Sequence, residues 1–284
     1  MMSGPDRSSH SGAAPASTLA GIVVAAGSGQ RLGAAVPKAL VPLAGRPLIA
    51  WAAQLLARAG VAAPVVVYPH GYEDAFRAAC AGIVAGESIA SSIQVSSCIQ
   101  YVEGGATRSA SVRAGLAAID PLSEMVIVHD AARPLMPSAV LAAAVAAVEA
   151  GAVAAAPSMK VADTLKSVEG RRITGTVARE HLVAIQTPQV FRRHVLDRVM
   201  TDDAEATDEL ALVEAAAEIG VVDGMIATVD GSPFGYKLTT AADLAFLERL
   251  AVVPATATEP TAAESTAAES TATEPTGTEL AGEA

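Results

Sequence analysis

The chain has 284 residues, with 19 Lys and Arg against 30 Asp and Glu, which gives a formal net charge of −11 at pH 7. We expect no binding to nucleic acid, because affinity for a phosphate backbone comes from clustered Lys and Arg. The two cysteines, Cys80 and Cys98, exclude a disulfide scaffold and a zinc site built on cysteine. They favour a reducing compartment, so we expect a cytoplasmic protein.

Both ends of the chain are poor in large apolar residues. Residues 1–17 are small and polar, without the net positive charge that precedes the apolar core of a secretory signal. In residues 254–284, Glu recurs every five residues from Glu259 to Glu279, a period that builds neither a helix stripe nor a strand face. We therefore expect a disordered leader at 1–17, a folded domain at 18–253 and a disordered tail at 254–284. We expect no membrane contact, because no apolar run reaches the roughly 18 residues of a membrane helix.

Within the domain, short β-branched runs alternate with Ala- and Leu-rich segments of helical period. Strands are predicted at residues 19–25, 64–68, 99–102, 125–129, 152–156 and 221–229, and helices at 48–59, 109–118, 138–150, 209–219 and 241–250. This alternation predicts an α/β fold: a single Rossmann-like domain with a mostly parallel sheet and helices on both faces. In such sheets, ligands bind beyond the carboxyl ends of the strands.

Residues 157–190 interrupt this alternation with charged residues between apolar ones. Glu169-Gly170 is typical of a hairpin turn between two partly polar strands, so the segment is predicted to form a β-arm. Two strands are not stable alone in water. We expect the arm to pack on something else, and another subunit is one candidate.

A glycine-rich loop follows the first predicted strand. It reads Ala25-Ala26-Gly27-Ser28-Gly29-Gln30-Arg31-Leu32-Gly33, followed by Pro37-Lys38. The third Gly is one residue too far for a dinucleotide fingerprint, and no Gly-Lys-Ser/Thr makes a Walker loop. Two interpretations remain, a tight strand-to-helix turn or a loop whose backbone N–H groups bind phosphate. Two cations beside the loop in an acidic chain favour the phosphate site.

Six motifs in order resemble those of the 2-C-methyl-D-erythritol 4-phosphate cytidylyltransferases, a family of nucleotidyltransferases of the non-mevalonate isoprenoid pathway. After the glycine loop come Gly104-Gly105-Ala106-Thr107-Arg108 with Ser111-Val112, Val128-His129-Asp130-Ala131-Ala132-Arg133-Pro134, Asp163-Thr164, Thr187-Pro188-Gln189 and Thr207-Asp208-Glu209. The resemblance covers about 19–250. It implies transfer of CMP from CTP to the acceptor phosphate, with release of pyrophosphate.

The resemblance also implies a role for each matching residue. The catalytic residues would be Arg31, Lys38, Arg179 and Lys237. The nucleotide would contact Ala25, Ala26, Gly27, Gly29, Gly105, Arg108 and Ser111. The acceptor would contact Asp130, Arg133, Thr164, Thr187 and Thr207. In the family, the arm residues serve the neighbouring subunit, so a homodimer with shared active sites and a dimerisation arm at 157–190 is implied.

Triphosphate transfer implies a bridging Mg²⁺, although no ligand set for the metal is readable in the sequence. Ala39 and Ala106 depart from the family, which usually has Gln and often an acidic residue at these positions. The position of Ala106 lies near the cytosine edge, so the departure bears on base preference. Asp130 and Arg133 have an alternative use as a structural pair, and His129 is interpreted as structural.

Two other functions stay open. One is the same chemistry on another polyol phosphate such as ribitol 5-phosphate. The other is a non-catalytic nucleotide-binding regulator on the same fold, since a fold does not grant activity.

Overall fold

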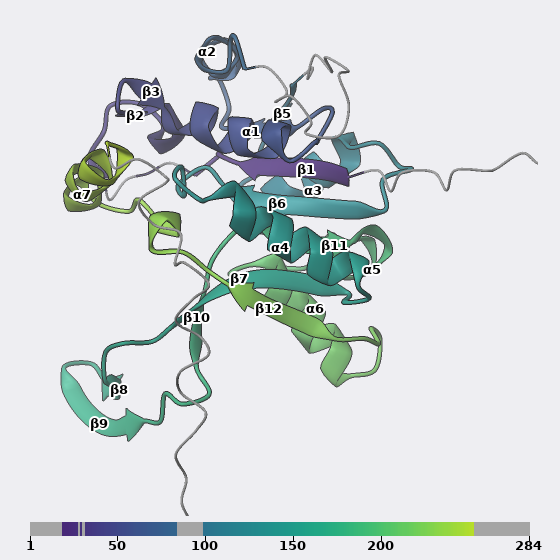
Figure 1. Ribbon diagram of the computed structural model, residues 1–284, viewed down its shortest axis with the longest axis vertical. Helices are drawn as coiled ribbons and strands as arrows, with labels where there is room; N and C mark the ends of the chain where they lie inside the picture. Colours follow the sequence, from purple (N-terminus) through teal and green to yellow (C-terminus); the bar gives the residue numbers. More distant parts are fainter. Residues whose placement is uncertain (1–18, 28, 30–31, 84–98, 253–284) are drawn as a thin grey trace, which may run out of the picture. The chain divides into compact units, whose positions relative to one another are not determined.

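The computed structural model describes residues 19–27, 29, 32–83 and 99–252 (Figure 1). The chain divides into two units, Met1–Ala251 and Val252–Ala284. The expected leader at 1–17 and tail at 254–284 lie outside the described residues, as does Cys98. Cys80 is a buried free thiol. In the described ranges, none of the helices combines the length and apolar character that a membrane crossing requires.

An eight-stranded sheet forms the centre of the first unit. The strand order is β10-β7-β11-β6-β1-β4-β5, and β12 pairs with the other edge of β7. The strands on this path are β10 (Val183–Ile185), β7 (Ala154–Lys160), β11 (Gln189–Arg192), β6 (Met125–Asp130), β1 (Leu19–Val24), β4 (Val65–Tyr68) and β5 (Gln100–Glu103), with β12 (Ile226–Asp230) beside them. Strands β6, β1, β4 and β5 pair in parallel, whereas β11 runs antiparallel between β6 and β7. The predicted mostly parallel sheet is therefore confirmed.

Helices cover both faces of this sheet. One layer packs on Val23 and Ile127, and consists of α1 (Leu48–Arg58), α2 (Glu73–Ala79) and α4 (Ser138–Glu149). The other layer packs on Ile22 and Val128, and consists of α3 (Arg108–Ala118), α5 (Arg193–Val199) and α6 (Glu209–Glu218). Figure 1 shows α1 and α4 in front of the sheet and α3 behind it. Because successive strand residues point to opposite faces, strands covered on both faces are apolar at every position.

The last helix packs away from the main sheet. Helix α7 (Ala241–Ala251) contributes Leu247 to a third apolar cluster with Leu43 and Leu238. Leu43 belongs to a small hairpin of β2 (Pro42–Leu43) and β3 (Arg46–Pro47), which follows the short 3-10 helix η2 (Lys38–Leu40). A second 3-10 helix, η3 (Pro233–Gly235), precedes Leu238.

Several elements differ from the sequence prediction. Where a strand was predicted at 221–229, the structure has the shorter strand β12. Helices α2 and α5 and strands β10 and β11 were not predicted. Strands β10 and β11 are too short for their apolar pattern to stand out, and tertiary pairing with β7 decides their conformation. Strand β7 continues through Pro157, whose carbonyl still accepts from the Gln186 N–H at 2.8 Å.

The predicted β-arm is present as a hairpin. Strands β8 (Leu165–Glu169) and β9 (Arg172–Val177) pair antiparallel in a sheet of their own, and Figure 1 shows them beyond the end of β7, apart from the main sheet. The turn lies at Gly170 and Arg171, one position beyond the predicted one, and Gly170 has a φ of 58°. Val168 is 61% exposed and Ile173 is 64% exposed. Within this chain, the apolar side chains of the hairpin are therefore largely uncovered.

Helix α3 lies directly on β1 at Gly115. A Cβ at this position would be 2.6 Å from Cγ2 of Ile22 and 3.0 Å from Cγ2 of Val67. We expect Gly115→Ala to lower the free energy of unfolding by about 1–3 kcal/mol through overpacking, against a helix-propensity gain of about 1 kcal/mol. Urea unfolding measures this loss. Gly175→Ala, where a Cβ meets nothing within 4 Å, should stay within about 0.5 kcal/mol of wild type. Unchanged stability of Gly115→Ala would contradict the close approach.

Candidate active site

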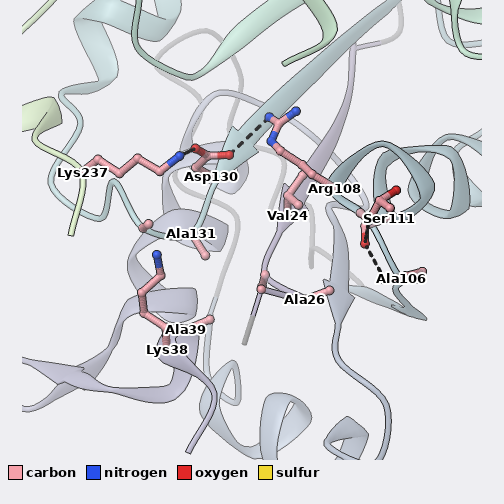
Figure 2. Close-up of a pocket in the computed structure, with 15 residues that line it drawn as sticks. Val24, Ala26, Lys38, Ala39, Ala106, Arg108, Ser111, Asp130, Ala131 and Lys237 are labelled. Atoms are coloured by element: carbon pink, nitrogen blue, oxygen red, sulfur yellow. Dashed lines mark hydrogen bonds and ion pairs between the residues drawn. The ribbon is translucent and has the colours of Figure 1, made fainter. Parts of the chain in front are cut away.

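A pocket of about 400 Å³ opens at the carboxyl ends of β1 and β6 (Figure 2). These strands are neighbours, and Val24 at the end of β1 lies opposite Asp130 at the end of β6. The pocket is lined by Val24, Ala25, Ala26, Gly27, Lys38, Ala39, Gly105, Ala106, Thr107, Arg108, Ser111, Asp130, Ala131, Ala132 and Lys237. The site therefore lies where ligands bind in open α/β sheets.

The glycine loop forms one wall of this pocket. Gly29 has a φ of +63°, and a Cβ there would be 2.6 Å from Cβ of Lys38. The glycine thus lets η2 approach the loop and brings Lys38 to the pocket, where its Nζ donates to the carbonyl of Leu238 at 3.1 Å. Figure 2 shows the Lys38 ammonium directed toward the segment that carries Ala131. Arg31 lies outside the described residues.

The opposite wall is the beginning of α3. Thr107 caps the helix, because its hydroxyl accepts from the Ala110 N–H at 3.1 Å. The Ser111 hydroxyl is buried and donates to the Thr107 carbonyl at 2.9 Å. A Cβ on Gly104 would be 2.5 Å from Cβ of Ala26 and 2.8 Å from Oγ of Ser111. A larger residue at Gly104 would therefore push the two walls apart.

The carboxylate of Asp130 lies between two cations. Lys237 Nζ donates to Oδ2 at 2.7 Å, and Arg108 Nη2 donates to Oδ1 at 3.3 Å. Burial acts to raise the pKa of Asp130, but the charges of Arg108 and Lys237 outweigh it and hold that pKa well below its usual range. Asp130 is therefore ionised at neutral pH, and it fixes the position of both cations.

Residues behind the strand end hold Asp130 in place. The Asp130 N–H donates to Oγ1 of Thr187 at 3.0 Å, and this hydroxyl is also hydrogen-bonded to Nδ1 of His129 at 3.1 Å. Burial lowers the pKa of His129 to about 4, so its imidazole is neutral at pH 7. Thr187 is itself buried. It contacts the backbone N–H of the pocket residue Asp130 but does not line the pocket.

Arg133 faces backbone carbonyls instead of the pocket. Its Nη1 donates to the carbonyl of Gly235 at 2.7 Å, and its Nη2 donates to the carbonyl of Ile185 at 3.3 Å. In the described part of the chain no ion pair joins Arg133 to Asp130, although the charges are near enough for Arg133 to help lower the pKa of Asp130. Arg133 thus attaches the segment that carries Lys237 to β10.

Three predicted site residues lie away from this pocket. Thr164 and Arg179 are exposed residues of the arm, and the Arg179 guanidinium donates to the Ala162 carbonyl. Thr207 is exposed just before Asp208, which caps α6 and accepts from Gln189 Nε2 at 2.9 Å. Of the predicted site residues, the pocket of one chain therefore brings together Ala25, Ala26, Gly27, Lys38, Gly105, Arg108, Ser111, Asp130 and Lys237. It does not include Gly29 or the arm residues.

Glu209 binds the pocket residue Arg108, and the sequence alone gave it no separate role. It is buried, and its Oε1 accepts from Nη1 of Arg108. Burial acts to lower the pKa of Arg108. The carboxylates of Asp130 and Glu209 act to raise it and together outweigh burial, so the pKa lies above its usual value. The only sequence signal for Glu209 is its place in Thr207-Asp208-Glu209.

The described residues of the pocket offer few side-chain ligands for a metal ion. They contain no group of three or more His, Cys, Asp or Glu placed to hold a metal ion. Asp130 is the one carboxylate that lines the pocket in these ranges, and both of its oxygens already accept from cations. A divalent ion there would need most of its ligands from a bound molecule.

The fold and the pocket together define a Rossmann-like α/β nucleotidyltransferase. The model of the 2-C-methyl-D-erythritol 4-phosphate cytidylyltransferase family, IspD, matches residues 19–251. The chain belongs to this family. The family, the fold and the enzyme class expected from the six motifs are therefore confirmed.

Similar proteins come from several bacteria. The 2-C-methyl-D-erythritol 4-phosphate cytidylyltransferase of Nocardia farcinica is 38% identical over 237 residues, which cover 82% of this chain and 94% of that protein. The enzyme of the same name from Saccharopolyspora erythraea is 40% identical over 236 residues, covering 81% and 98%. A bifunctional enzyme IspD/IspF of Clavibacter michiganensis is 40% identical over 248 residues, which cover 87% of this chain and 57% of that protein.

A solved structure shows the same fold. The crystal structure of 2-C-methyl-D-erythritol 4-phosphate cytidylyltransferase from Thermus thermophilus is 30% identical in sequence and has a TM-score of 0.62. The match covers 82% of this chain and 98% of that structure. The described domain is therefore comparable with a whole chain of a solved relative.

The depressed pKa of Asp130 predicts how stability depends on pH. Its ion pairs stabilise the fold fully above the unfolded-state pKa of about 3.9, and this contribution is lost as the pH falls toward the lower folded-state pKa. We expect the difference in unfolding free energy between wild type and Asp130→Asn to be constant from about pH 6 to 8 and to shrink by roughly 1.4 kcal/mol per pH unit below about pH 4.

Urea unfolding of both proteins across this range measures the difference. Asp74→Asn, at an exposed position on α2, controls for the removal of one charge. A difference that stays flat down to about pH 3, or that grows as the pH falls, would contradict the lowered pKa of Asp130.

Proposed function

We propose that the chain transfers CMP from CTP to 2-C-methyl-D-erythritol 4-phosphate, giving 4-diphosphocytidyl-2-C-methyl-D-erythritol and pyrophosphate. The observation that carries this proposal is the pocket in which a glycine loop, Lys38, Arg108 and Lys237 surround one ionised carboxylate, Asp130. The family membership supports the acceptor, since the relatives described above carry the name of that reaction. We also propose that the enzyme is cytoplasmic.

The chemistry is attack of an acceptor phosphate oxygen on the α-phosphorus of CTP. A new P–O bond forms to the acceptor, the bond to the β-phosphate breaks, and pyrophosphate leaves with its electron pair. Such transfer depends on positioning and on neutralising charge. In our proposal, Lys38 and Arg31 neutralise the triphosphate, and backbone N–H groups at Gly27 and Gly29 approach it.

The remaining residues would position the two substrates. Arg108 and Ser111 contact the nucleotide at the beginning of α3, with the backbone of Ala25, Ala26 and Gly105 around it. Asp130 accepts hydrogen bonds from the hydroxyls of the acceptor, and Lys237 attracts its phosphate. Thr187 and Arg133 support this side from behind, because they hold the backbone at Asp130 and at Gly235. Thr207 lies just before the N-cap residue of α6, and in this proposal it contacts the acceptor.

Mg²⁺ enters as part of the substrate, Mg–CTP. The phosphates would supply most of its ligands. The ion would neutralise part of the charge on the triphosphate.

We further propose a homodimer whose arms complete the partner's site. Arg179 and Thr164 belong to the exposed arm, and neither lines the pocket of its own chain. The hairpin also leaves Val168 and Ile173 exposed, which a second subunit would cover. In a symmetric dimer each arm reaches the other chain, so Arg179 would bind the acceptor phosphate bidentately opposite Lys237.

Pyrophosphate release tests the reaction. Mg–CTP is assayed with 2-C-methyl-D-erythritol 4-phosphate, erythritol 4-phosphate and ribitol 5-phosphate, and then with UTP, ATP and GTP in place of CTP. We expect turnover with CTP and the methylerythritol phosphate, loss of activity with EDTA and recovery with Mg²⁺. Turnover only with ribitol 5-phosphate would replace the acceptor. CTP binding without turnover would indicate a regulator.

Subunit complementation tests the shared site. Lys38→Ala and Arg179→Ala homodimers should each lose about 10²–10³-fold in turnover, as when one preorganised charge is removed. Mixing and re-equilibrating the two should restore up to about a quarter of wild-type activity, because half of the dimers are mixed and each of these has one intact site. Arg58→Ala, exposed at the end of α1, should stay at wild-type activity. Verified mixed dimers without recovery would place the site within one chain.

A further inference from the structure

Glu209 is a buried carboxylate just outside the pocket. It is the first residue of α6, and its side chain is only 1% exposed. Oε1 accepts from Nη1 of Arg108, which lies 101 residues away in the chain, and Oε2 is buried without a hydrogen-bond partner. Burial raises the pKa of Glu209, although Arg108 opposes this shift. The side chain of this buried carboxylate therefore contacts the pocket through one residue, Arg108.

Arg108 is held between carboxylates from two different elements. Nη1 donates to Glu209 on α6, and Nη2 donates to Asp130 on β6. Because the guanidinium is planar and its donors are fixed relative to each other, two acceptors define the orientation of its plane. With one acceptor alone, the group can rotate about that single contact. Two of its five N–H donors are used in this way, and within the described ranges no hydrogen bond uses the others.

Three further contacts keep Glu209 in register with Arg108. The segment 201–209 follows the beginning of α3: Thr107 Oγ1 donates to Glu205 at 2.7 Å, and the Ala206 N–H donates to Ser109 Oγ at 3.2 Å. One turn further along α3, Arg113 Nη1 donates to the Ala204 carbonyl at 2.7 Å. Residues on both sides of Arg108 thus contact the segment that ends at Glu209. These contacts hold the segment before Glu209 against the helix that carries Arg108.

We propose that Glu209 is a positioning residue that orients the Arg108 guanidinium between α6 and Asp130 for binding of the nucleotide. This inference rests on the proposed function, because it takes CTP as the ligand of the pocket. Glu209 itself does not line the pocket, so it acts through Arg108. Its loss should weaken nucleotide binding more than it slows the chemical step.

Glu209→Gln tests this role, because it keeps the size and one acceptor of the side chain and removes its charge. We expect the Kd of Mg–CTP from calorimetry, and the KM for CTP, to rise about tenfold, with kcat within about threefold and the melting temperature nearly unchanged. Glu209→Asp keeps the charge and should recover part of the affinity. Glu214→Gln is the matched control, because Glu214 is an exposed glutamate further along the same helix. Its Kd should stay within about twofold of wild type.

A double mutant separates positioning from a general structural effect. If Glu209 acts through Arg108, Arg108→Ala with Glu209→Gln should bind Mg–CTP no more weakly than Arg108→Ala alone. An unchanged Kd for Glu209→Gln, an equal loss for Glu214→Gln or additive losses in the double mutant would each overturn the inference. Should Glu209→Gln fail to fold, an Asp variant with wild-type affinity and kcat would overturn it as well.

The binding measurement needs neither acceptor nor turnover. Wild-type protein that binds Mg–CTP without transferring CMP would therefore overturn the proposed function while leaving the comparison at Glu209 valid. Wild-type protein that binds no CTP would overturn both.

Discussion

The ionised carboxylate of Asp130 is buried at the end of β6 and accepts from Lys237 at 2.7 Å and from Arg108 at 3.3 Å. A buried charge of this kind is stable only when it is paired and hydrogen-bonded. The two cations come from α3 and from the segment after η3, so Asp130 connects both sides of the pocket. The electrostatics of the pocket depend on this one group, because its charge sets the positions of two of the cations that line it.

The main sheet determines where Asp130 lies. Parallel pairing of β1 with β6 aligns Val24 with Asp130, which places the glycine loop beside the carboxylate. The antiparallel strand β11 then follows Thr187, whose hydroxyl accepts from the Asp130 N–H. Arg133 connects the carbonyls of Ile185 and Gly235, and thereby holds the segment of Lys237 against the sheet. The sheet and the segments attached to it thus place the carboxylate that binds Arg108 and Lys237.

Glycine residues, which have no side chain, matter as much as charged residues at this site. Gly29 permits the approach of Lys38, Gly104 permits the approach of Ala26 and Ser111, and Gly115 permits α3 to lie on β1. The contacts at Gly29 and Gly104 involve pocket residues directly, and the contact at Gly115 holds α3 close to the sheet. Charged groups on rigid elements bind a ligand well only when the supporting backbone is placed to within about 0.5 Å.

The sequence by itself determined the alternation of strands and helices, the glycine loop, the hairpin and the six motifs, because these depend on periods and spacings within short segments. It therefore located Arg108 at the beginning of a helix and Asp130 at the end of a strand, as the structure has them. Only the tertiary structure decided that β11 is antiparallel, that Arg133 faces backbone carbonyls, and that Glu209 reaches Arg108 across 101 residues. Such contacts follow from the register of distant strands and the packing of distant helices, which no local pattern encodes.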